Sequence, residues 1–572
     1  MFNRFVVKFE LGANIKSDLN DGVLLFDGVA YKNGRIFSSE NFPKSIDDVI
    51  NADIDGQWMS VVKVNRKKIV STDFFGFYSI FYAIDGSGNL LVSNNYDALI
   101  QCLKDIGVNL SFDLLVVFPM LTSSYSFFDQ AFSSQTGCAQ IRRLLPNEAI
   151  EIYDNLWKII KKSEKISEPY EDLISKGSLA VKRDLQGMSE MGFYNTQLSL
   201  SGGKDSRAVL ALSYGAVPNL SIRTTPRFED GGSLKSKIID RDFEIALNIV
   251  SNYDLPWNCV NEVLVDPIRF DDALDYYRFF RSSNYYRTNL SRYRTSVTYG
   301  GSYVELAGGC GEVLRGFWGE YFKNINYGSK IYENRFNKKK CGNYVFAALV
   351  KKNARLEDYY QDSLSWFGGE IEQIDGQDFF EAIDNHYFLH RNRYHFGNQR
   401  DSWRAGKLLY YPLGKKEFFQ ASKSVSSDLK MKGKLVFDII NHNKSELHGF
   451  DYETPFAYSR YNNIKKNINI KEELIERRKK DFLNVLNNQK KYNKVAYERK
   501  SFDLKINLNG KFKENIEICR SNKDLDNILD VVLSKYDPKD WNQKDIKFFT
   551  KIDSLALMLE SKKTIYSMFV FN

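Results

Sequence analysis

The stretch of chain that decides the fold is QLSLSGGKDSRAVLAL, residues 197–212. A short hydrophobic segment, 197–200, ends in small residues, and a helix-forming segment, 207–212, follows at once. We therefore expect a strand, a tight loop and the start of a helix. Adjacent glycines let a ligand approach the backbone closely, and the N–H groups at the start of a helix favour an anion. The loop is predicted to bind phosphate.

The sequence of this loop excludes a Walker-type nucleotide site. Lys204 is followed by Asp205 rather than by Ser or Thr, and Leu198 stands where such a loop has its first glycine. The loop instead resembles the SGGxDS loop of the N-type ATP pyrophosphatases, and of the asparagine synthetase superfamily in particular. That resemblance implies pyrophosphate release from ATP, with nucleotide contacts at Ser201, Gly202, Gly203, Asp205 and Ser206. The alternative is a structural turn in which Asp205 or Ser206 caps the helix.

A second glycine-rich loop follows another expected strand. The strand YVEL, residues 303–306, runs into AGGCGEVLRGFW, residues 307–318. The loop resembles the SGxGADELFGGY loop of asparagine synthetases, and more closely the GxGGEVLRG form of divergent members. The resemblance adds Gly308 to the expected nucleotide contacts. Finding both loops in this order favours the superfamily over two unrelated glycine turns.

The second loop departs from the family pattern at its metal ligand. The Asp that asparagine synthetases use for magnesium aligns with Gly311, which leaves Glu312 as the only carboxylate of the loop. The resemblance therefore implies Mg²⁺ at Asp205 and Glu312, with phosphate oxygens of ATP as further ligands. Glu312 and Arg315 are the expected catalytic residues. Arg315 would either neutralise the departing pyrophosphate or pair with Glu312, and the sequence leaves both roles open.

The region from about residue 170 to 460 alternates strand-like and helical segments, which predicts a parallel sheet covered by helices. Expected elements are strands at 219–224 and 259–265 and a helix from Asp240 through Ile249. Ligands of such sheets lie at the carboxyl ends of the strands, so Thr224 is expected to line the adenine or the ribose. The fold class is α/β, and the resemblance implies a PP-loop (HUP-like) synthetase domain over residues 166–470.

Residues 1–165 are β-rich, with alternating segments at 5–9, 58–64, 68–71 and 78–82 and a hairpin turn at 85–88. STDFFGFYSIFY, residues 71–82, resembles a strand pair of the Ntn-hydrolase-like glutamine amidotransferase domain that precedes asparagine synthetase domains. IRRLLPNE, residues 141–148, resembles a turn near the end of that domain. The resemblance implies that residues 1–165 form such a domain.

A glutaminase of this kind needs a cysteine immediately after Met1, where the thiol attacks and the α-amine serves as base. Phe2 occupies that position, and a phenyl ring cannot be a nucleophile. We therefore expect a degenerate amidotransferase-like domain that does not release ammonia from glutamine.

Composition narrows the class of protein. The 572 residues include no run of about eighteen apolar residues, and the start of the chain lacks a secretion signal, so we expect a cytoplasmic protein without a membrane span. The six cysteines form no CxxC pair and are expected to be reduced thiols. His386 and His390 have helical spacing, but their aromatic neighbours favour packing over a metal site.

The net charge of the chain is +8, and the excess of basic residues is concentrated around residues 465–491. Interspersed acidic residues favour a solvated helix face with ion pairs, so nucleic acid is not an expected partner. Residues 471–572 are predicted to form a basic, helical C-terminal extension with no recognisable chemistry. Lys432 and Lys434 lie where the family has a catalytic lysine, but no motif fixes either of them.

The expected function is an ATP-dependent amide-forming ligase that adenylates a carboxylate and passes it to an amine or to ammonia. The carboxylate would belong to a small molecule, a sugar acid or a peptide. β-Lactam synthetases and lasso-peptide cyclases share the loss of the N-terminal cysteine. The alternative is a catalytically silent nucleotide-binding scaffold, and a homo-oligomer or partner protein stays open. Sulfur transfer to tRNA, which uses a set of reactive cysteines, is not expected.

Overall fold

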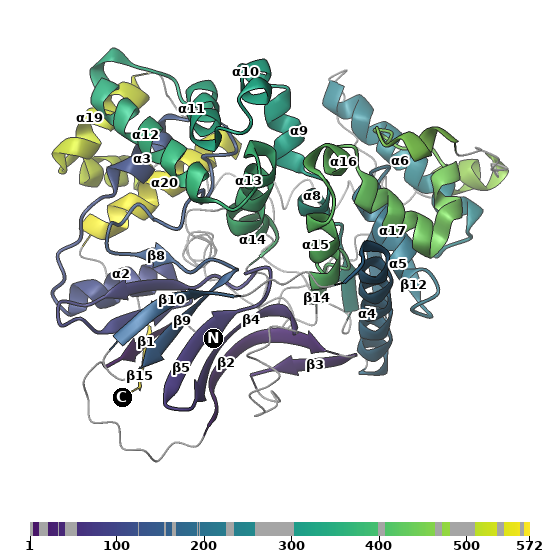
Figure 1. Cartoon of the computed structure of the whole chain (residues 1–572), viewed down its shortest axis with the longest axis horizontal. Helices are drawn as coiled ribbons and strands as arrows, with labels where there is room; N and C mark the ends of the chain where they lie inside the picture. Colours follow the sequence, from purple (N-terminus) through teal and green to yellow (C-terminus); the bar gives the residue numbers. More distant parts are fainter. Residues whose placement is uncertain are drawn as a thin grey trace.

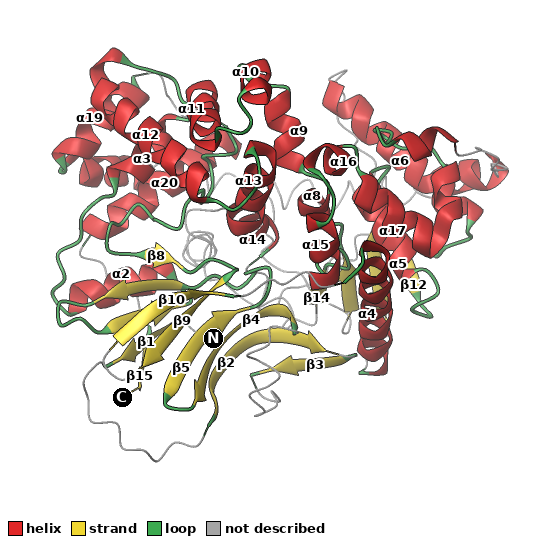
Figure 2. Cartoon of the chain, viewed as in Figure 1, coloured by secondary structure: helices red, strands yellow, loops and turns green. Residues whose placement is uncertain are grey.

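The computed structural model describes a mixed α/β protein with three sheets and many helices (Figure 1, Figure 2). The described residues are 4–10, 21–32, 34–39, 54–123, 125–153, 156–162, 168–191, 193, 195–224, 234–257, 303–397, 407–463, 472–480, 510–534, 543–560 and 566–571. Phe2 and the strand expected at 259–265 lie outside them. Among the described helices, none is both long and apolar enough to cross a bilayer.

The first sheet joins the two ends of the described chain. Its strands, in spatial order, are β15 (Ser567–Phe571), β1 (Phe5–Phe9), β7 (Leu90–Ser93), β6 (Phe81–Ile84) and β8 (Arg142–Arg143). The predicted hairpin is present as β6 and β7, because Asp85 accepts backbone hydrogen bonds from Ser87 and Asn89 and closes the turn. β15 pairs with β1 in parallel and was not expected from the sequence, which suggested only helix in this extension.

The second sheet is antiparallel throughout and packs on the first. Its order is β10 (Leu156–Lys161), β9 (Glu148–Tyr153), β5 (Lys67–Thr72), β4 (Asp55–Val64), β2 (Gly22–Lys32) and β3 (Arg35–Ser38). Alternate residues of β1, such as Phe5 and Val7, share one hydrophobic core with Met59 and Val61 of β4. The intervening Val6 faces the other way, into the core beneath the helices. The period-2 pattern of the sequence therefore builds a two-sheet sandwich.

The third sheet is parallel, as the alternating pattern predicts. Its order is β12 (Leu220–Arg223), β11 (Asn195–Ser199), β13 (Tyr303–Leu306) and β14 (Lys407–Tyr410). The helices that accompany it are α4 (Tyr170–Glu190), α5 (Lys204–Ser213), α6 (Leu234–Asn252), α15 (Lys416–Lys423), α16 (Ser427–Met431) and α17 (Lys434–Lys444). Figure 1 shows α4 and β14 beside the strand β3 of the second sheet.

The other helices are α2 (Tyr96–Asp105), α3 (Leu114–Thr122), α8 (Gly311–Leu314), α9 (Phe317–Lys323), α10 (Gly328–Glu333), α11 (Lys338–Leu349), α12 (Glu357–Gln373), α13 (Phe379–His386), α14 (Arg393–Phe396), α19 (Lys523–Leu533) and α20 (Gln543–Leu559). They include α2, which packs on the first sheet, α8, which lies beside α15, and a layer above the sandwich (Figure 2). The short 3₁₀ turns are η2 (Ala354–Leu356), η5 (Ser445–Gly449) and η6 (Ser459–Asn463), and η3 (Tyr387–Asn392) is a π-helix.

A buried ion cluster joins the sandwich to the parallel sheet. Lys415, whose side chain is 1% exposed, donates hydrogen bonds to Asp55 of β4 and to Asp184 of α4. The hydroxyl of Tyr410, at the end of β14, also donates to Asp184, at 3.0 Å. Burial raises the pKa of Asp55 to about 6, although the Lys415 ammonium opposes that rise. The cluster therefore connects β4 of the sandwich with α4 and the end of β14. Because the cluster is buried, removing one member would leave a charge that water does not compensate.

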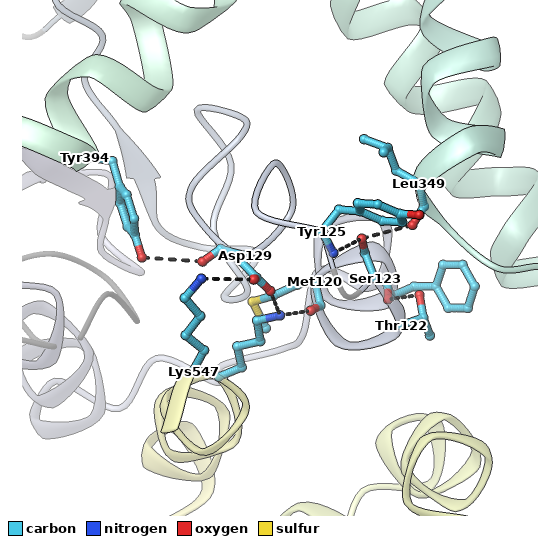
Figure 3. Close-up of polar contacts among 10 residues, drawn as sticks. Met120, Thr122, Ser123, Tyr125, Asp129, Leu349, Tyr394 and Lys547 are labelled. Carbon is cyan, nitrogen blue, oxygen red and sulfur yellow. Dashed lines mark hydrogen bonds and ion pairs between the residues drawn. The ribbon is translucent and has the colours of Figure 1, made fainter. Parts of the chain in front are cut away.

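Helix α20 is anchored to the loop after α3 through one carboxylate (Figure 3). Asp129 accepts hydrogen bonds from Lys551 at 2.6 Å and from Lys547 at 3.4 Å. Lys551 also donates to the carbonyl of Met120 at 2.7 Å. Lys104 of α2 donates to the carbonyls of Leu557 and Glu560 and so caps the end of α20. The C-terminal helix is thus a structural part of the N-terminal sandwich.

Lys551→Met is expected to lower the free energy of unfolding by about 2 kcal/mol, because the substitution leaves a buried carbonyl without its donor and weakens a nearly buried ion pair. The matched control is Lys547→Met, whose side chain is 37% exposed against 3% for Lys551. The control is expected to lose less than about 1 kcal/mol. Denaturant unfolding of both variants checks this, and equal losses would contradict the anchoring role of Lys551.

The predicted packing role of the histidine pair is confirmed by its geometry. His386 stacks on Phe127 with ring centroids 4.9 Å apart, and its Nε2 lies 2.8 Å from the carbonyl oxygen of Phe132. Burial lowers the pKa of His386 to about 4 and that of His390 well below its ordinary value. Both rings are therefore neutral members of the core.

His386 is expected to make the protein less stable in mild acid. In the unfolded chain His386 has a pKa of about 6.5 and is protonated in mild acid, whereas in the folded protein it stays neutral. The free energy of unfolding therefore falls as the pH drops from about 6.5 towards 4. Between pH 7 and 5 this contribution is about 2 kcal/mol. His386→Phe keeps the stack and should flatten the pH dependence by that amount in denaturant unfolding. The wild type at the same pH values is the reference, and an unchanged pH dependence in His386→Phe would contradict the assignment.

Candidate functional site

The two glycine-rich loops lie side by side at the carboxyl edge of the parallel sheet. β11 leads into Ser201–Gly203 and α5, and the neighbouring strand β13 leads into 307–310 and α8. Leu198 of β11 is level with Ile222 of β12 and Leu306 of β13, so these strands end at the same edge. The sequence predicted both strand-to-loop units and the helix after the first of them, and parallel pairing brings the two loops together.

The first loop is held by its own hydroxyl groups. Ser206 Oγ accepts a hydrogen bond from the Ser201 N–H at 3.2 Å, and Ser201 Oγ accepts one from the Gly203 N–H at 3.2 Å. The two hydroxyl oxygens are 3.0 Å apart. A side chain at Gly202 would come within 2.7 Å of Asp242 Oδ1. The loop is therefore a tight turn at the start of a ten-residue helix, whose first N–H groups have no acceptor within the helix.

The second loop packs directly against Asp205. A Cβ atom at Gly308 would lie 3.2 Å from the Cβ of Asp205 and from the N atom of Ser206. A Cβ atom at Gly311 would overlap the Asp205 carboxylate. An aspartate at position 311 would therefore fit only if Asp205 moved.

Arg315 pairs with Asp205, a partner that the sequence analysis did not consider. Its Nε and Nη2 atoms each lie 3.2 Å from Asp205 Oδ2, and the two side chains are 24% and 18% exposed. Burial alone would lower the pKa of Arg315, but the charges of Asp205 and Glu312 raise it above its ordinary value. The guanidinium is therefore a fixed positive charge between the two loops.

Each of the two loops has one carboxylate oxygen that is buried without a hydrogen-bond partner among the described residues. They are Asp205 Oδ1 and Glu312 Oε2. Burial and the nearby Asp205 carboxylate raise the pKa of Glu312 to about 7, while Arg315 opposes that rise. Unpartnered carboxylate oxygens that repel each other are suitable ligands for a divalent cation. The residues predicted to hold magnesium thus fit such an ion.

Thr224 is buried just beyond the end of β12, at the same edge as the two loops. Asp242 of α6 lies against the backbone of Gly202. Burial, followed by the charge of Glu453, raises the pKa of Asp242 to about 6. Asp242 was expected only as part of a helix, so its contact with the first loop adds a titratable group to the site.

Lys204 is a cation of the first loop to which the sequence analysis gave no role. Its Nζ atom lies 4.9 Å from the centre of the Phe456 ring. Burial, followed by the charge of Arg315, lowers the pKa of Lys204. The site therefore carries two cations, one engaged with Asp205 and one stacked on an aromatic ring.

A segment far along the chain covers the first loop; we call residues 447–456 the strap. The fully buried Arg207 of α5 donates to the carbonyls of Leu447, Phe450 and Asp451. Its guanidinium also lies 3.6 Å from the centre of the Tyr452 ring. The N–H of Glu453 donates to the carbonyl of Gly202 at 3.1 Å. No motif pointed to the strap, because its contacts with the loop are made largely by backbone carbonyls.

Other candidate residues have structural partners. Lys434 donates to Asp438, and its ammonium lies 4.3 Å from the centre of the Tyr170 ring. In the basic region, the helical residues 472–480 carry a Lys479–Glu476 ion pair at 3.0 Å, and Arg478 contacts Asp254. These described contacts agree with a solvated helix face. The five cysteines within the described ranges are buried and unpaired.

Comparison with known proteins gives little beyond this geometry. No family model and no curated protein matches the chain. One similar solved structure is glutamine phosphoribosylpyrophosphate amidotransferase from B. subtilis with ADP and GMP, at 14% identity and a TM-score of 0.13, over 48% of this chain and 47% of that one. Another is the allosteric regulatory enzyme of purine biosynthesis, at 13% identity and a TM-score of 0.13, over 49% and 46%. The chain thus spans about half of the length of each, and the fold is described here by its own sheet topology.

Proposed function

We propose that this chain is an ATP-dependent amide-forming ligase that releases pyrophosphate. The observation that carries the proposal is the direct contact between the two glycine-rich loops, which groups Asp205, Glu312 and Arg315 at the carboxyl ends of adjacent parallel strands. The resemblance of both loops to the asparagine synthetase superfamily supplies the reaction class. The activated carboxylate would belong to a small molecule, a sugar acid or a peptide.

In the proposed reaction a carboxylate oxygen attacks the α-phosphorus of ATP. The bond from that phosphorus to the bridging oxygen of the β-phosphate breaks, and pyrophosphate leaves with the bonding electrons. An amine nitrogen then attacks the acyl carbon, AMP leaves, and the nitrogen gives up a proton. Because negative charge builds on the departing phosphates, fixed cations and helix N–H groups at this edge would lower the barrier.

Each residue has a defined part in this proposal. Ser201, Gly202, Gly203 and Ser206 shape the turn that brings the backbone to the phosphates, and Gly308 and Thr224 line the nucleotide from the neighbouring strands. Asp205 and Glu312 would hold Mg²⁺, which supplies charge neutralisation on the phosphates when bound. Arg315 would stabilise charge on the pyrophosphate. Residues 1–165 would be an amidotransferase-like domain.

Two measurements on the wild-type protein test the proposal. Calorimetry with ATP and Mg²⁺ should show binding, and exchange of labelled pyrophosphate into ATP should appear with one or more members of a panel of amino acids, sugar acids and peptides. A protein that binds no ATP at millimolar concentration would contradict the proposal. Binding without exchange across the panel would favour the second candidate, a silent nucleotide-binding scaffold, which the occupation of Asp205 by Arg315 also favours.

A further inference from the structure

The charged side chain of Lys204 contacts an aromatic ring, whereas those of Asp205 and Arg315 form an ion pair. Asp205 and Arg315 pair with each other at 3.2 Å. The ammonium of Lys204 lies over the ring of Phe456, and the described residues provide it with no carboxylate in ion-pair range. The first loop therefore contains one positive charge whose hydrogen-bonding capacity is not used by the part of the chain that the structure describes.

This arrangement is unfavourable in the absence of a ligand. Lys204 is the first residue of α5, after the N-cap residue Gly203, where the positive end of the helix dipole repels a cation. The side chain is also partly buried, and the guanidinium of Arg315 is a second positive charge nearby. A cation placed unfavourably in this way is typical of binding sites, because a ligand of opposite charge relieves the repulsion.

The position of Lys204 is fixed rather than free. Phe456 is 4% exposed and packs against Phe437, Tyr452 and Tyr461, with ring centroids 5.0–5.7 Å apart. The strap that carries Phe456 is itself bound to α5 by Arg207. An aromatic ring held in this way restricts the ammonium that lies over it, so less side-chain entropy is lost when the ammonium binds an anion.

We propose that Lys204, positioned by Phe456, binds the two outer phosphates of ATP and therefore holds pyrophosphate as it leaves. The proposal rests on the proposed function and adds a specificity: the site should retain pyrophosphate more tightly than AMP. Lys204 is the first residue of α5 and so belongs to the helix end that has free N–H groups, and Asp205 Oδ1 and Glu312 Oε2, which lack hydrogen-bond partners among the described residues, would ligate the accompanying cation.

Lys204→Met tests the proposal with pyrophosphate and Mg²⁺ as the probe in calorimetry. We expect pyrophosphate affinity to fall about 10- to 100-fold, as for loss of a charge-assisted hydrogen bond. The affinity for AMP should stay within about twofold. Lys204→Arg should retain more pyrophosphate affinity than Lys204→Met. The control is Lys479→Met, which removes a lysine paired with Glu476 on a separate helix and should change neither affinity.

The ligand-free stability of the same variant gives an independent readout. Because Lys204→Met removes an unpaired cation from the start of a helix, its melting temperature without ligand should equal or exceed that of the wild type. A purely structural lysine would give a lower one. Phe456→Leu keeps an apolar side chain but removes the aromatic platform, and should weaken pyrophosphate binding without changing AMP binding.

The outcomes separate this inference from the proposed function. If the wild type binds neither ATP nor pyrophosphate, the proposed function fails and this inference fails with it. If the wild type binds pyrophosphate and Lys204→Met binds it equally well, only the role of Lys204 is wrong. A variant that melts well below the wild type, with pyrophosphate and AMP affinities reduced alike, would also overturn that role.

Discussion

Asp205→Asn is expected to slow ATP–pyrophosphate exchange by at least about 100-fold, the usual cost of removing one electrostatic stabiliser from a reacting centre. Asparagine keeps the size of the side chain and so preserves the packing against Gly308 and Gly311. It removes the negative charge that holds Arg315 and that would ligate the metal. The measurement is exchange of labelled pyrophosphate into ATP, with the carboxylate that gives the highest wild-type rate.

The matched control for this variant is Asp530→Asn on the exposed face of α19, where the carboxylate lies 3.7 Å from Arg355 and is 63% exposed. The control should keep wild-type exchange. Asp205→Asn should also remain folded at room temperature, because the lost ion pair with Arg315 is offset in part by relief of the repulsion between Asp205 and Glu312. Full exchange activity in Asp205→Asn would show that the metal and the catalytic charge have been placed on the wrong residue.

Lys415→Met is expected to lower the free energy of unfolding by about 3–5 kcal/mol, which is typical when one member of a buried ion cluster is removed. The methionine would fill a similar volume but would leave Asp184 and Asp55 facing each other without a cation. Denaturant unfolding at pH 7 measures the loss. Lys67→Met is the matched control and should cost less than about 1 kcal/mol, because Lys67 is 42% exposed and its partner Glu151 keeps a second ion pair with Lys158.

The triple variant Lys415→Met, Asp55→Asn, Asp184→Asn distinguishes charge from packing. Neutralising both carboxylates removes the uncompensated charge, so the triple variant should recover most of the stability that Lys415→Met loses. A triple variant less stable than the single one would show that hydrogen bonds of the carboxylates, such as that from Tyr410, carry the stabilisation instead.

Local sequence signals predicted the parts of the fold that depend on neighbouring residues. The hairpin at 81–93, the parallel sheet and both strand-to-loop units follow from hydrophobic periodicity and glycine placement. β15 was missed because SMFVF is too short to separate strand from helix by pattern, and its pairing with β1 is a contact between distant segments.

The sequence predicted which residues form the candidate site but not which of them pair with each other. The sequence placed Asp205, Glu312 and Arg315 at one edge, since both loops follow parallel strands. It considered Glu312 and the pyrophosphate as partners of Arg315, whereas the guanidinium lies on Asp205. No sequence motif predicted the strap, because its contacts with Arg207 and Gly202 are made by backbone groups, which every residue type has.

The parallel pairing of β1 with β15 also sets an order of assembly during synthesis. β1 is translated long before β15, so one of its two neighbours in the sheet is not available until residue 571 has been translated. In the meantime the nascent chain exposes an apolar strand edge, which other chains can pair with. Folding of the first sheet is therefore expected to be completed only after translation of β15, and chaperone binding near the N-terminus would protect it until then.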